Sequence, residues 1–180
     1  MLGLKRETVM LLPHQKEWIE NAGLMIKLLK KLLGSKAVDV QHIGSTAIPA
    51  IHAKPIIDLV VGVYNLSEIS SESERLSQHG IVFRGEDVAG QLLFVAGDFE
   101  KDTRTHHIHV VQWNGKEWNH YINFRDYLNY FPEKAKQYDA NKQKLALQYP
   151  NDRKRYTAEK QQLIAQFLKE AEKWRAGLLF

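Results

Sequence analysis

The sequence predicts an α+β fold: a mixed β-sheet flanked by helices, followed by a helical C-terminal half. Up to residue 112, segments with helical spacing of apolar residues alternate with short β-branched segments. After residue 113 only helical spacing remains. The length of 180 residues fits a single domain. We expect an α/β core over about residues 1–113 and a helical subdomain over about residues 114–180.

The elements of the first half follow from apolar spacing and turn residues. Apolar residues three and four positions apart after Pro13 predict an amphipathic helix that ends at Gly34. Residues 37–43 form a predicted strand, and residues 56–63 are a nearly continuous β-branched run, typical of a strand covered on both faces. A short helix over 67–78 and strands over 81–84, 92–96 and 105–112 complete this half.

Three helices are predicted for the C-terminal half. They run from about residue 117 to 130, from Pro132 to 149, and from Asp152 into the 170s. The last helix has the clearest apolar stripe, which consists of Tyr156, Leu163, Phe167, Ala171, Trp174 and Leu178.

The composition limits the classes of function. Without cysteine the chain has no disulfide and no cysteine-ligated metal, and we expect a cytoplasmic protein. No apolar run is long enough to span a bilayer, so we expect no membrane partner. The formal charge of +4 suits a nucleotide or another phosphorylated small molecule. It is too small and too scattered to favour RNA binding, and no heptad seam predicts an oligomeric state.

The segment Gly44-Ser45-Thr46 follows a predicted strand and is a candidate phosphate-binding turn. Glycine lets backbone N–H groups approach an anion, and the two hydroxyl groups can donate to the same oxygens. The same three residues also suit a helix N-cap, with Ser45 accepting from the first free amides.

Asp58 lies in the middle of an apolar strand, thirteen positions after Ser45. Alternation places it with Val60 on one strand face and Ile57 with Leu59 on the other. A carboxylate in such a strand is costly unless it is paired or binds a metal. A metal ligand or catalytic carboxylate and a buried pair with Lys54 or an arginine are the two alternatives.

The Gly-Ser to Asp spacing resembles that of the nucleotidyltransferase superfamily of the DNA polymerase β type. More closely, the chain resembles the GrpB family over about residues 13–175. The segments that carry this resemblance are His42–Pro49, Ala53–Asp58, Arg84–Glu86, Arg104–Val111, Phe124–Leu128 and Tyr156–Thr157, with Pro132, Tyr138, Lys142, Leu145 and Lys160 between and after them.

The resemblance implies a nucleotidyltransferase-like sheet, in which the turn holds a triphosphate and strand carboxylates hold two Mg²⁺ ions. The superfamily has a second acid two residues after the first, where this chain has Val60. Glu86 is a candidate replacement, although an exposed loop glutamate is an equal alternative. Lys54 is a candidate for neutralising phosphate charge.

Alternation in the strand over 105–112 places His107 and His109 on one face. If that face meets Asp58, two imidazoles and a carboxylate could bind Mn²⁺, Zn²⁺ or Fe²⁺, or supply a general base. The alternative is a pair of histidines satisfied by neighbouring side chains.

Arg125 lies on an aromatic helix, where an unpaired charge would be costly. Phosphate binding and an ion pair with Asp126 or Asp58 explain it equally. Most other basic residues of the helical half, including Lys142, Arg153 and Lys160, are expected on solvated faces.

These observations predict a nucleotidyltransferase that depends on Mg²⁺ or Mn²⁺ and moves a nucleoside monophosphate from an NTP to a small acceptor. Asp58, His107 and His109 are the candidate catalytic residues. The alternative is an inactive nucleotide-binding or partner-docking module of the same fold, which the valine at position 60 favours.

Overall fold

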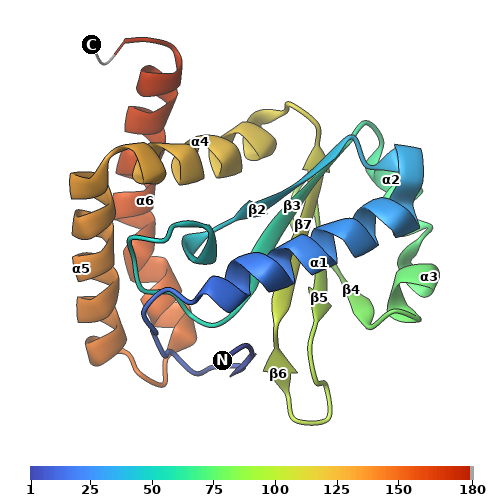
Figure 1. Cartoon of the computed structure of the whole chain (residues 1–180), viewed down its shortest axis with the longest axis horizontal. Coiled ribbons are helices and arrows are strands. Elements are labelled where there is room, and N and C mark those ends of the chain that lie inside the picture. The colour runs from blue at the N-terminus through green and yellow to red at the C-terminus, as the bar shows by residue number, and fades with distance from the viewer. Residues whose placement is uncertain (179–180) are drawn as a thin grey trace.

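Five strands form a mixed sheet in the order β2-β3-β7-β5-β4 in the computed structural model, which describes residues 1–178 (Figure 1). Strands β3 and β7 are parallel, and the other neighbouring pairs are antiparallel. The mixed sheet flanked by helices is therefore confirmed. The strands are β2 (Asp39–Ile43), β3 (Ile57–Val63), β7 (His106–Gln112), β5 (Gln91–Ala96) and β4 (Ile81–Val88).

One face of the sheet is covered by α1 (Lys16–Leu33), which crosses the strands in Figure 1. Its apolar stripe, including the fully buried Trp18, packs against Ile57, Leu59 and Val61 of β3. These β3 residues alternate with Asp58, so the apolar half of the strand faces the main core and the carboxylate faces away from it.

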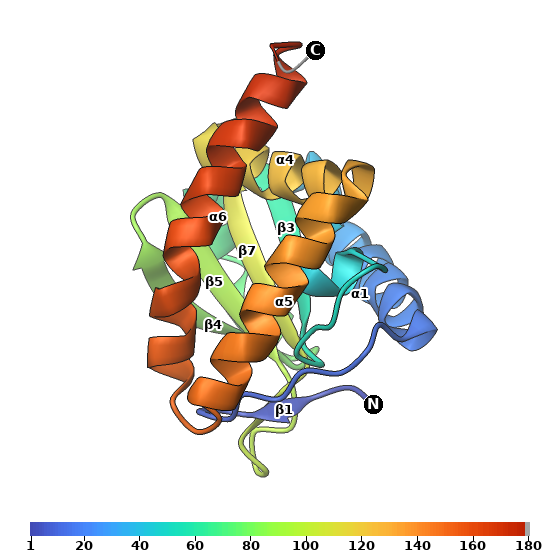
Figure 2. The same ribbon diagram turned by 90° about the vertical axis from the view of Figure 1, so that its left-hand side faces the viewer.

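The helical half covers the other face. It consists of α4 (Lys116–Tyr130), α5 (Pro132–Gln148) and α6 (Arg153–Arg175), and Figure 2 shows α5 and α6 in front of the strands. The three helices share a core in which Tyr127, Tyr138 and Phe167 pack together. Helix α4 places Trp118 in a smaller cluster with Val60 and residues of the neighbouring strands.

Glycine on β3 lets α4 approach the sheet closely. A Cβ atom at Gly62 would lie 2.7 Å from Trp113 and 2.9 Å from Trp118. On this face of β3, Asp58 is followed by Val60 and Gly62, which lie beneath the tryptophan side chains. Of these three residues, only Asp58 lines the cavity described below.

Several details differ from the sequence prediction. The helix expected over 67–78 is two single turns, α2 (Leu66–Ser70) and α3 (Ser73–Ser77). Strands β1 (Leu4–Lys5) and β6 (Thr103–Arg104) form a separate two-stranded sheet, which is too short for any alternation to reveal. Leu178, predicted on the last apolar stripe, lies beyond α6 and is 73% exposed.

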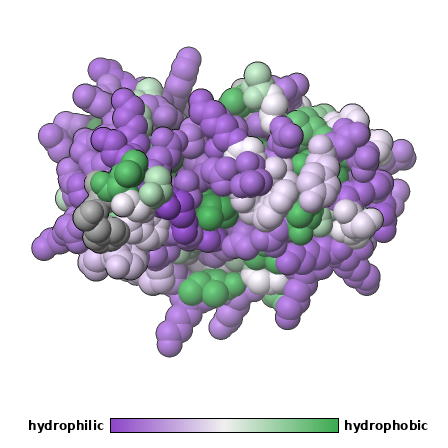
Figure 3. Space-filling model, turned by 90° about the horizontal axis from the view of Figure 1, so that it is seen from above, coloured by the Kyte–Doolittle hydropathy of each residue, from purple (hydrophilic) through white to green (hydrophobic). Residues whose placement is uncertain are grey.

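In the view from above, hydrophilic side chains dominate and hydrophobic areas are small and separate (Figure 3). Within residues 1–178, none of the helices combines the length and the apolar character needed to cross a membrane.

Candidate functional site

A cavity of about 360 Å³ lies between the open sheet face and the helical half. The turn after β2, the first part of β3, strand β7 and helices α5 and α6 all contribute to its wall. Its polar lining consists of Gly44, Ser45, Thr46, Lys54, Asp58, His107, His109, Tyr121, Tyr138, Lys142, Arg153, Tyr156, Thr157 and Lys160. Seven of the residues predicted from the sequence are therefore brought to one place.

Gly44 lies directly against the carboxylate of Asp58. Its backbone has φ 69° and ψ −171°, a region that is essentially restricted to glycine. A Cβ atom here would lie 2.5 Å from Asp58 Oδ2. The turn and the carboxylate can therefore be this close only if position 44 is glycine.

The turn after Gly44 is not the start of a long helix. Residues Ser45–Ala47 form a single 3₁₀ turn, so the expected charge of a helix N-terminus is absent here. The alternative role of Ser45 as a helix cap is not observed either. Its hydroxyl oxygen instead accepts a hydrogen bond from Lys142 Nζ at 3.2 Å and interacts with Tyr138.

Thr46 is 1% exposed, and its side chain forms a hydrogen bond within the protein. Its Oγ1 lies 2.8 Å from His42 Nε2, and its carbonyl oxygen lies 3.2 Å from His14 Nε2. Burial lowers the pKa of His42 to about 4, so this imidazole is neutral at pH 7. Thr46 therefore anchors the turn, and Ser45 is the hydroxyl that lies nearer the cations.

Asp58 pairs with both predicted histidines. Because Asp58 is in register with His107 on the parallel strand β7, their side chains share a face, and Asp58 Oδ1 lies 3.2 Å from His107 Nδ1. His109 Nε2 lies 4.0 Å from the same oxygen. Burial would raise the pKa of Asp58, but the His107 hydrogen bond and the charges of His107, His109 and Lys54 lower it to about 2.

Four cationic side chains surround this carboxylate. They are Lys54, Lys142, Arg153 and Lys160, three of them from α5 and α6. Burial lowers the pKa of Lys54 and of Lys142 to about 7, and that of Lys160 to about 8. The charges of Lys160 and Arg153 lower the pKa of Lys54 further, whereas Asp58 opposes the shift. The cavity therefore has an excess of positive charge that an anion would offset.

Lys142 connects α5 to the turn formed by residues 44–46. It is 1% exposed, and its ammonium group donates to Ser45 Oγ and to the carbonyl oxygen of His52. Asp139 Oδ1, 3.9 Å away, is its nearest acidic partner, and Asp139 also accepts from the backbone N–H of His52 at 2.7 Å. Lys142 thus holds the turn in place and adds charge to the cavity wall.

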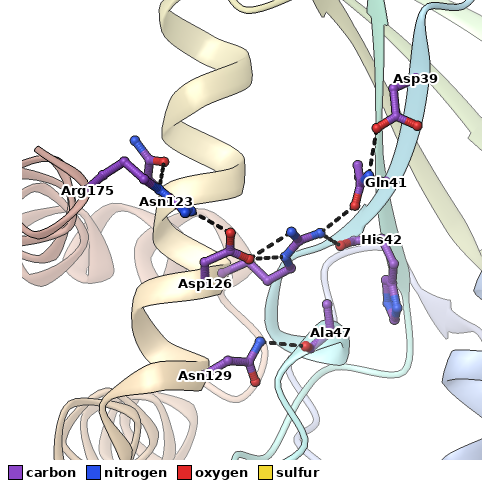
Figure 4. A network of polar contacts seen from close by, with 9 residues as sticks. Asp39, Gln41, His42, Ala47, Asn123, Asp126, Asn129 and Arg175 are labelled. Atoms are coloured by element: carbon purple, nitrogen blue, oxygen red, sulfur yellow. Dashed lines mark hydrogen bonds and ion pairs between the residues drawn. The ribbon is translucent and has the colours of Figure 1, made fainter.

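Arg125 was a predicted phosphate ligand, and its position in the structure corrects that expectation. It does not line the cavity. Its guanidinium group donates to Asp126 at 2.8 Å, to Gln41 at 2.9 Å and to the carbonyl oxygen of His42 at 3.0 Å. Figure 4 shows the surrounding network, in which Arg175 extends the chain of contacts from Asp126. Arg125 therefore joins α4 to β2, as the ion-pair alternative anticipated.

Glu86 is not brought to Asp58. It lies on β4, and strands β5 and β7 separate β4 from β3. Its side chain is exposed and accepts a hydrogen bond from the backbone N–H of Gly90 at 2.6 Å. Val60, the position of the missing second acid, is 0% exposed and packs in the cluster that contains Trp118. No second carboxylate therefore stands beside Asp58 among the described residues.

Among its described residues, the cavity offers too few protein donors for the two ions that the resemblance implies. Within the described part of the chain, no three His, Asp or Glu side chains are arranged to hold a metal without other ligands. Asp58 and His107 are the closest pair of donors, and Mg²⁺ commonly uses one or two carboxylates together with substrate phosphates. A single ion would therefore need phosphate oxygens to complete its coordination.

Sequence reasoning missed the helical side of the cavity. Lys142, Arg153 and Lys160 were expected on solvated faces, because charged helix residues usually are. The wide spacing of these residues gives no sign that α5 and α6 point them inwards. The signal that could have identified two of them is the resemblance to the GrpB family, which includes Lys142 and Lys160.

Comparisons with known proteins agree with this resemblance. The family model described as "GrpB protein" matches residues 8–170. The Glutamate-rich protein GrpB of Alkalihalophilus pseudofirmus is 40% identical over 152 residues, which are 83% of this chain and 87% of that protein.

Two solved structures match at different levels. The crystal structure of the conserved protein GrpB from Enterococcus faecalis matches with a TM-score of 0.80 and 29% identity, covering 89% of this chain and 98% of that one. A structure of Cid1 in complex with its short product ApU matches with a TM-score of 0.47 and 13% identity, covering 75% of this chain and 40% of that one. No functional conclusion follows from a likeness as low as the second.

Proposed function

The chain belongs to the GrpB family, and we propose that its cavity binds a nucleoside triphosphate and transfers the nucleoside monophosphate group to a small acceptor. The observation that carries this proposal is the cluster of Lys54, Lys142, Lys160 and Arg153 around one carboxylate and a glycine turn. Several cations in one enclosed site need several negative charges to offset them, and a triphosphate supplies these in a single ligand.

Each side of the cavity has a part in this proposal. The β- and γ-phosphates lie against Gly44, Ser45 and the lysines of α5 and α6. Lys54 lies over the ring of Tyr156 at 5.5 Å and adds a further charge to the wall. Fixed cations of this kind stabilise charge that develops on the leaving group.

The transfer step uses the pair of Asp58 and His107. Asp58 is ionised at pH 7 and accepts a hydrogen bond from His107 Nδ1, which directs the other ring nitrogen, Nε2, away from the carboxylate. The acceptor hydroxyl oxygen bonds to the α-phosphorus while the bond to the β-phosphate oxygen breaks. Pyrophosphate leaves, and the hydroxyl proton passes to His107 Nε2.

Asp58 is also the residue that would hold a Mg²⁺ or Mn²⁺ ion, with His109 as the second protein donor and phosphate oxygens as the rest. Such an ion, when bound, supplies additional neutralisation of phosphate charge.

A second candidate function is nucleotide binding without transfer. It is favoured by Val60, because the position of the usual second acid is buried under α4 and is closed to the cavity. In this candidate the same cations hold the nucleotide, and binding alone is the function.

Calorimetric titration with ATP, GTP, CTP and UTP, with and without Mg²⁺ or Mn²⁺, tests both candidates. We expect the wild type to bind at least one nucleotide more tightly with the metal, and Asp58→Asn to lose that gain. Asp98→Asn is the matched control, because Asp98 is an exposed carboxylate in an ion pair with Lys101. Pyrophosphate release that depends on Asp58 supports transfer, binding without release supports the second candidate, and no binding contradicts both.

A further inference from the structure

A second cavity lies beside the first and shares part of its wall. Its volume is about 280 Å³, and it is lined by Arg6, Glu7, Arg84, Val95 and Arg104 together with His107 and Arg153. His107 and Arg153 also line the first cavity. A molecule held in the second cavity would therefore lie next to the imidazole that faces the first.

The second cavity carries an excess of positive charge. Its lining includes four arginines and Glu7, and Asp102 adds one more carboxylate by pairing with Arg6 at 3.0 Å and with Arg104 at 3.3 Å. Arg84 and Arg153 form no ion pair with a carboxylate among the described side chains. Among the described side chains, four guanidinium groups against two carboxylates leave a net charge of +2.

Arg104 is the fixed centre of this group. Its side chain is 8% exposed, its Nη1 donates to the carbonyl oxygen of Thr103 at 3.0 Å, and it lies over the ring of Phe99 at 4.7 Å. Its backbone is held because Arg104 pairs with Leu4 between β6 and β1. Burial and the charge of Arg84 lower the pKa of Arg104, with smaller contributions from Arg6 and Arg153, while Asp102 opposes the shift. Asp102 offsets only part of the charge of a buried guanidinium beside three others, so a further anion would stabilise the group.

We propose that this arginine cavity binds a phosphate monoester, and that the phosphate belongs to the acceptor molecule of the transfer reaction. The net charge of +2 matches a phosphate dianion, whereas a carboxylate would offset only half of it. Guanidinium groups bind phosphate oxygens through two parallel hydrogen bonds, which also fixes the orientation of the ligand. Only the identification of the ligand as the acceptor rests on the proposed function; the anion site does not.

The position of His107 links the two cavities in one reaction. An acceptor anchored by its phosphate in the arginine cavity would present a hydroxyl group to His107 at the shared wall. Its oxygen bonds to the α-phosphorus of the nucleotide, pyrophosphate leaves, and the hydroxyl proton passes to His107 Nε2. The acceptor phosphate itself is unchanged by the step.

The test is a titration with inorganic phosphate at saturating ATP, followed by NMR on the arginine Nε–H signals. Arg84→Gln is the informative variant, because Arg84 is exposed and is not part of the core. Arg75→Gln is the matched control, because Arg75 is an exposed arginine on α3 that pairs with Glu72. Arg84→Gln loses the two hydrogen bonds that a guanidinium group donates to phosphate, and this loss should weaken phosphate binding by about tenfold or more.

We expect the wild type and Arg75→Gln to bind phosphate equally, Arg84→Gln to bind it more weakly, and all three to bind ATP equally. Phosphate binding that is unaffected by Arg84→Gln overturns the proposal, as does an equal loss of ATP affinity in this variant. Acetate that binds as tightly as phosphate overturns the choice of phosphate. If phosphate binding depends on Arg84 but ATP does not bind, the anion site stands and the proposed function fails.

Discussion

At the residue scale, the site depends on how closely Gly44 approaches Asp58. The glycine has no side chain, and the carboxylate oxygen occupies the space in which a Cβ atom would lie. This contact holds Asp58 in one position on the side facing the turn, while His107 holds it on the other side at 3.2 Å. The orientation of the carboxylate is therefore set by a backbone atom and an imidazole together.

Substituting Gly44 by alanine tests this contact. We expect Gly44→Ala to lower the free energy of unfolding by about 1–3 kcal/mol from backbone strain alone, and further because Asp58 must move. Urea unfolding measures the loss. Gly80→Ala is the control, since Gly80 also has a positive φ of 74° but has nothing within 4 Å of its added Cβ. Equal losses in the two variants would show that the contact with Asp58 is unimportant.

The lysines of the cavity predict a pH dependence of nucleotide binding. In the free protein, burial lowers the pKa of Lys54 and Lys142 to about 7 and of Lys160 to about 8, so these amines lose protons as the pH rises through 7 to 8. A bound phosphate favours the charged amine, so binding at pH 8 must take up protons, whereas at pH 6 the amines are already charged.

Calorimetry in buffers of different ionisation enthalpy measures this uptake. We expect net proton uptake with ATP at pH 8, little uptake at pH 6, and an affinity that falls from pH 7 to pH 9. If ATP binds with no proton uptake at pH 8, its phosphates do not contact these lysines.

At the element scale, the parallel pairing of β3 and β7 brings Asp58 and His107 together. Alternation was sufficient to predict that His107 and His109 share a face, because side chains of a strand alternate strictly. That this face meets Asp58 depends on the pairing of β3 with β7, which alternation leaves open. For Arg125, the sequence left phosphate binding and an ion pair with Asp126 as equal alternatives, and the structure shows the ion pair. Its partners Gln41 and His42 are more than 80 residues away in the sequence, and no local pattern shows that α4 crosses β2.

Replacing Arg125 tests its revised role. Arg125→Gln removes the hydrogen bonds to Asp126 and to the carbonyl oxygen of His42, and we expect the free energy of unfolding to fall by about 1–3 kcal/mol. ATP affinity should stay within about twofold of wild type, because the side chain is outside the cavity. Thermal unfolding and ATP titration on the same samples measure both. A large loss of ATP affinity with unchanged stability would show that Arg125 binds phosphate, as first expected from the sequence.

At the scale of the whole molecule, the helical half covers one face of the sheet (Figure 2). The cavity lies between the two. The strands supply the carboxylate and imidazoles, whereas α5 and α6 supply most of the positive charge. Length, periodicity and alternation could predict the elements and the mixed sheet, because these depend on local spacing. The inward orientation of Lys142 and Lys160 could not be predicted in this way, because it depends on how two helices dock onto a distant surface.

The most direct test of the central claim, that the cavity cations bind nucleotide phosphates, is the calorimetric affinity for ATP of the wild type, Lys160→Gln and Lys169→Gln. Both lysines lie on α6, but Lys160 lines the cavity and Lys169 is exposed elsewhere on the helix. We predict that Lys160→Gln binds ATP about tenfold more weakly or worse, and that Lys169→Gln binds as the wild type does. Equal affinity in the two variants would contradict the assignment of this cavity to a nucleotide.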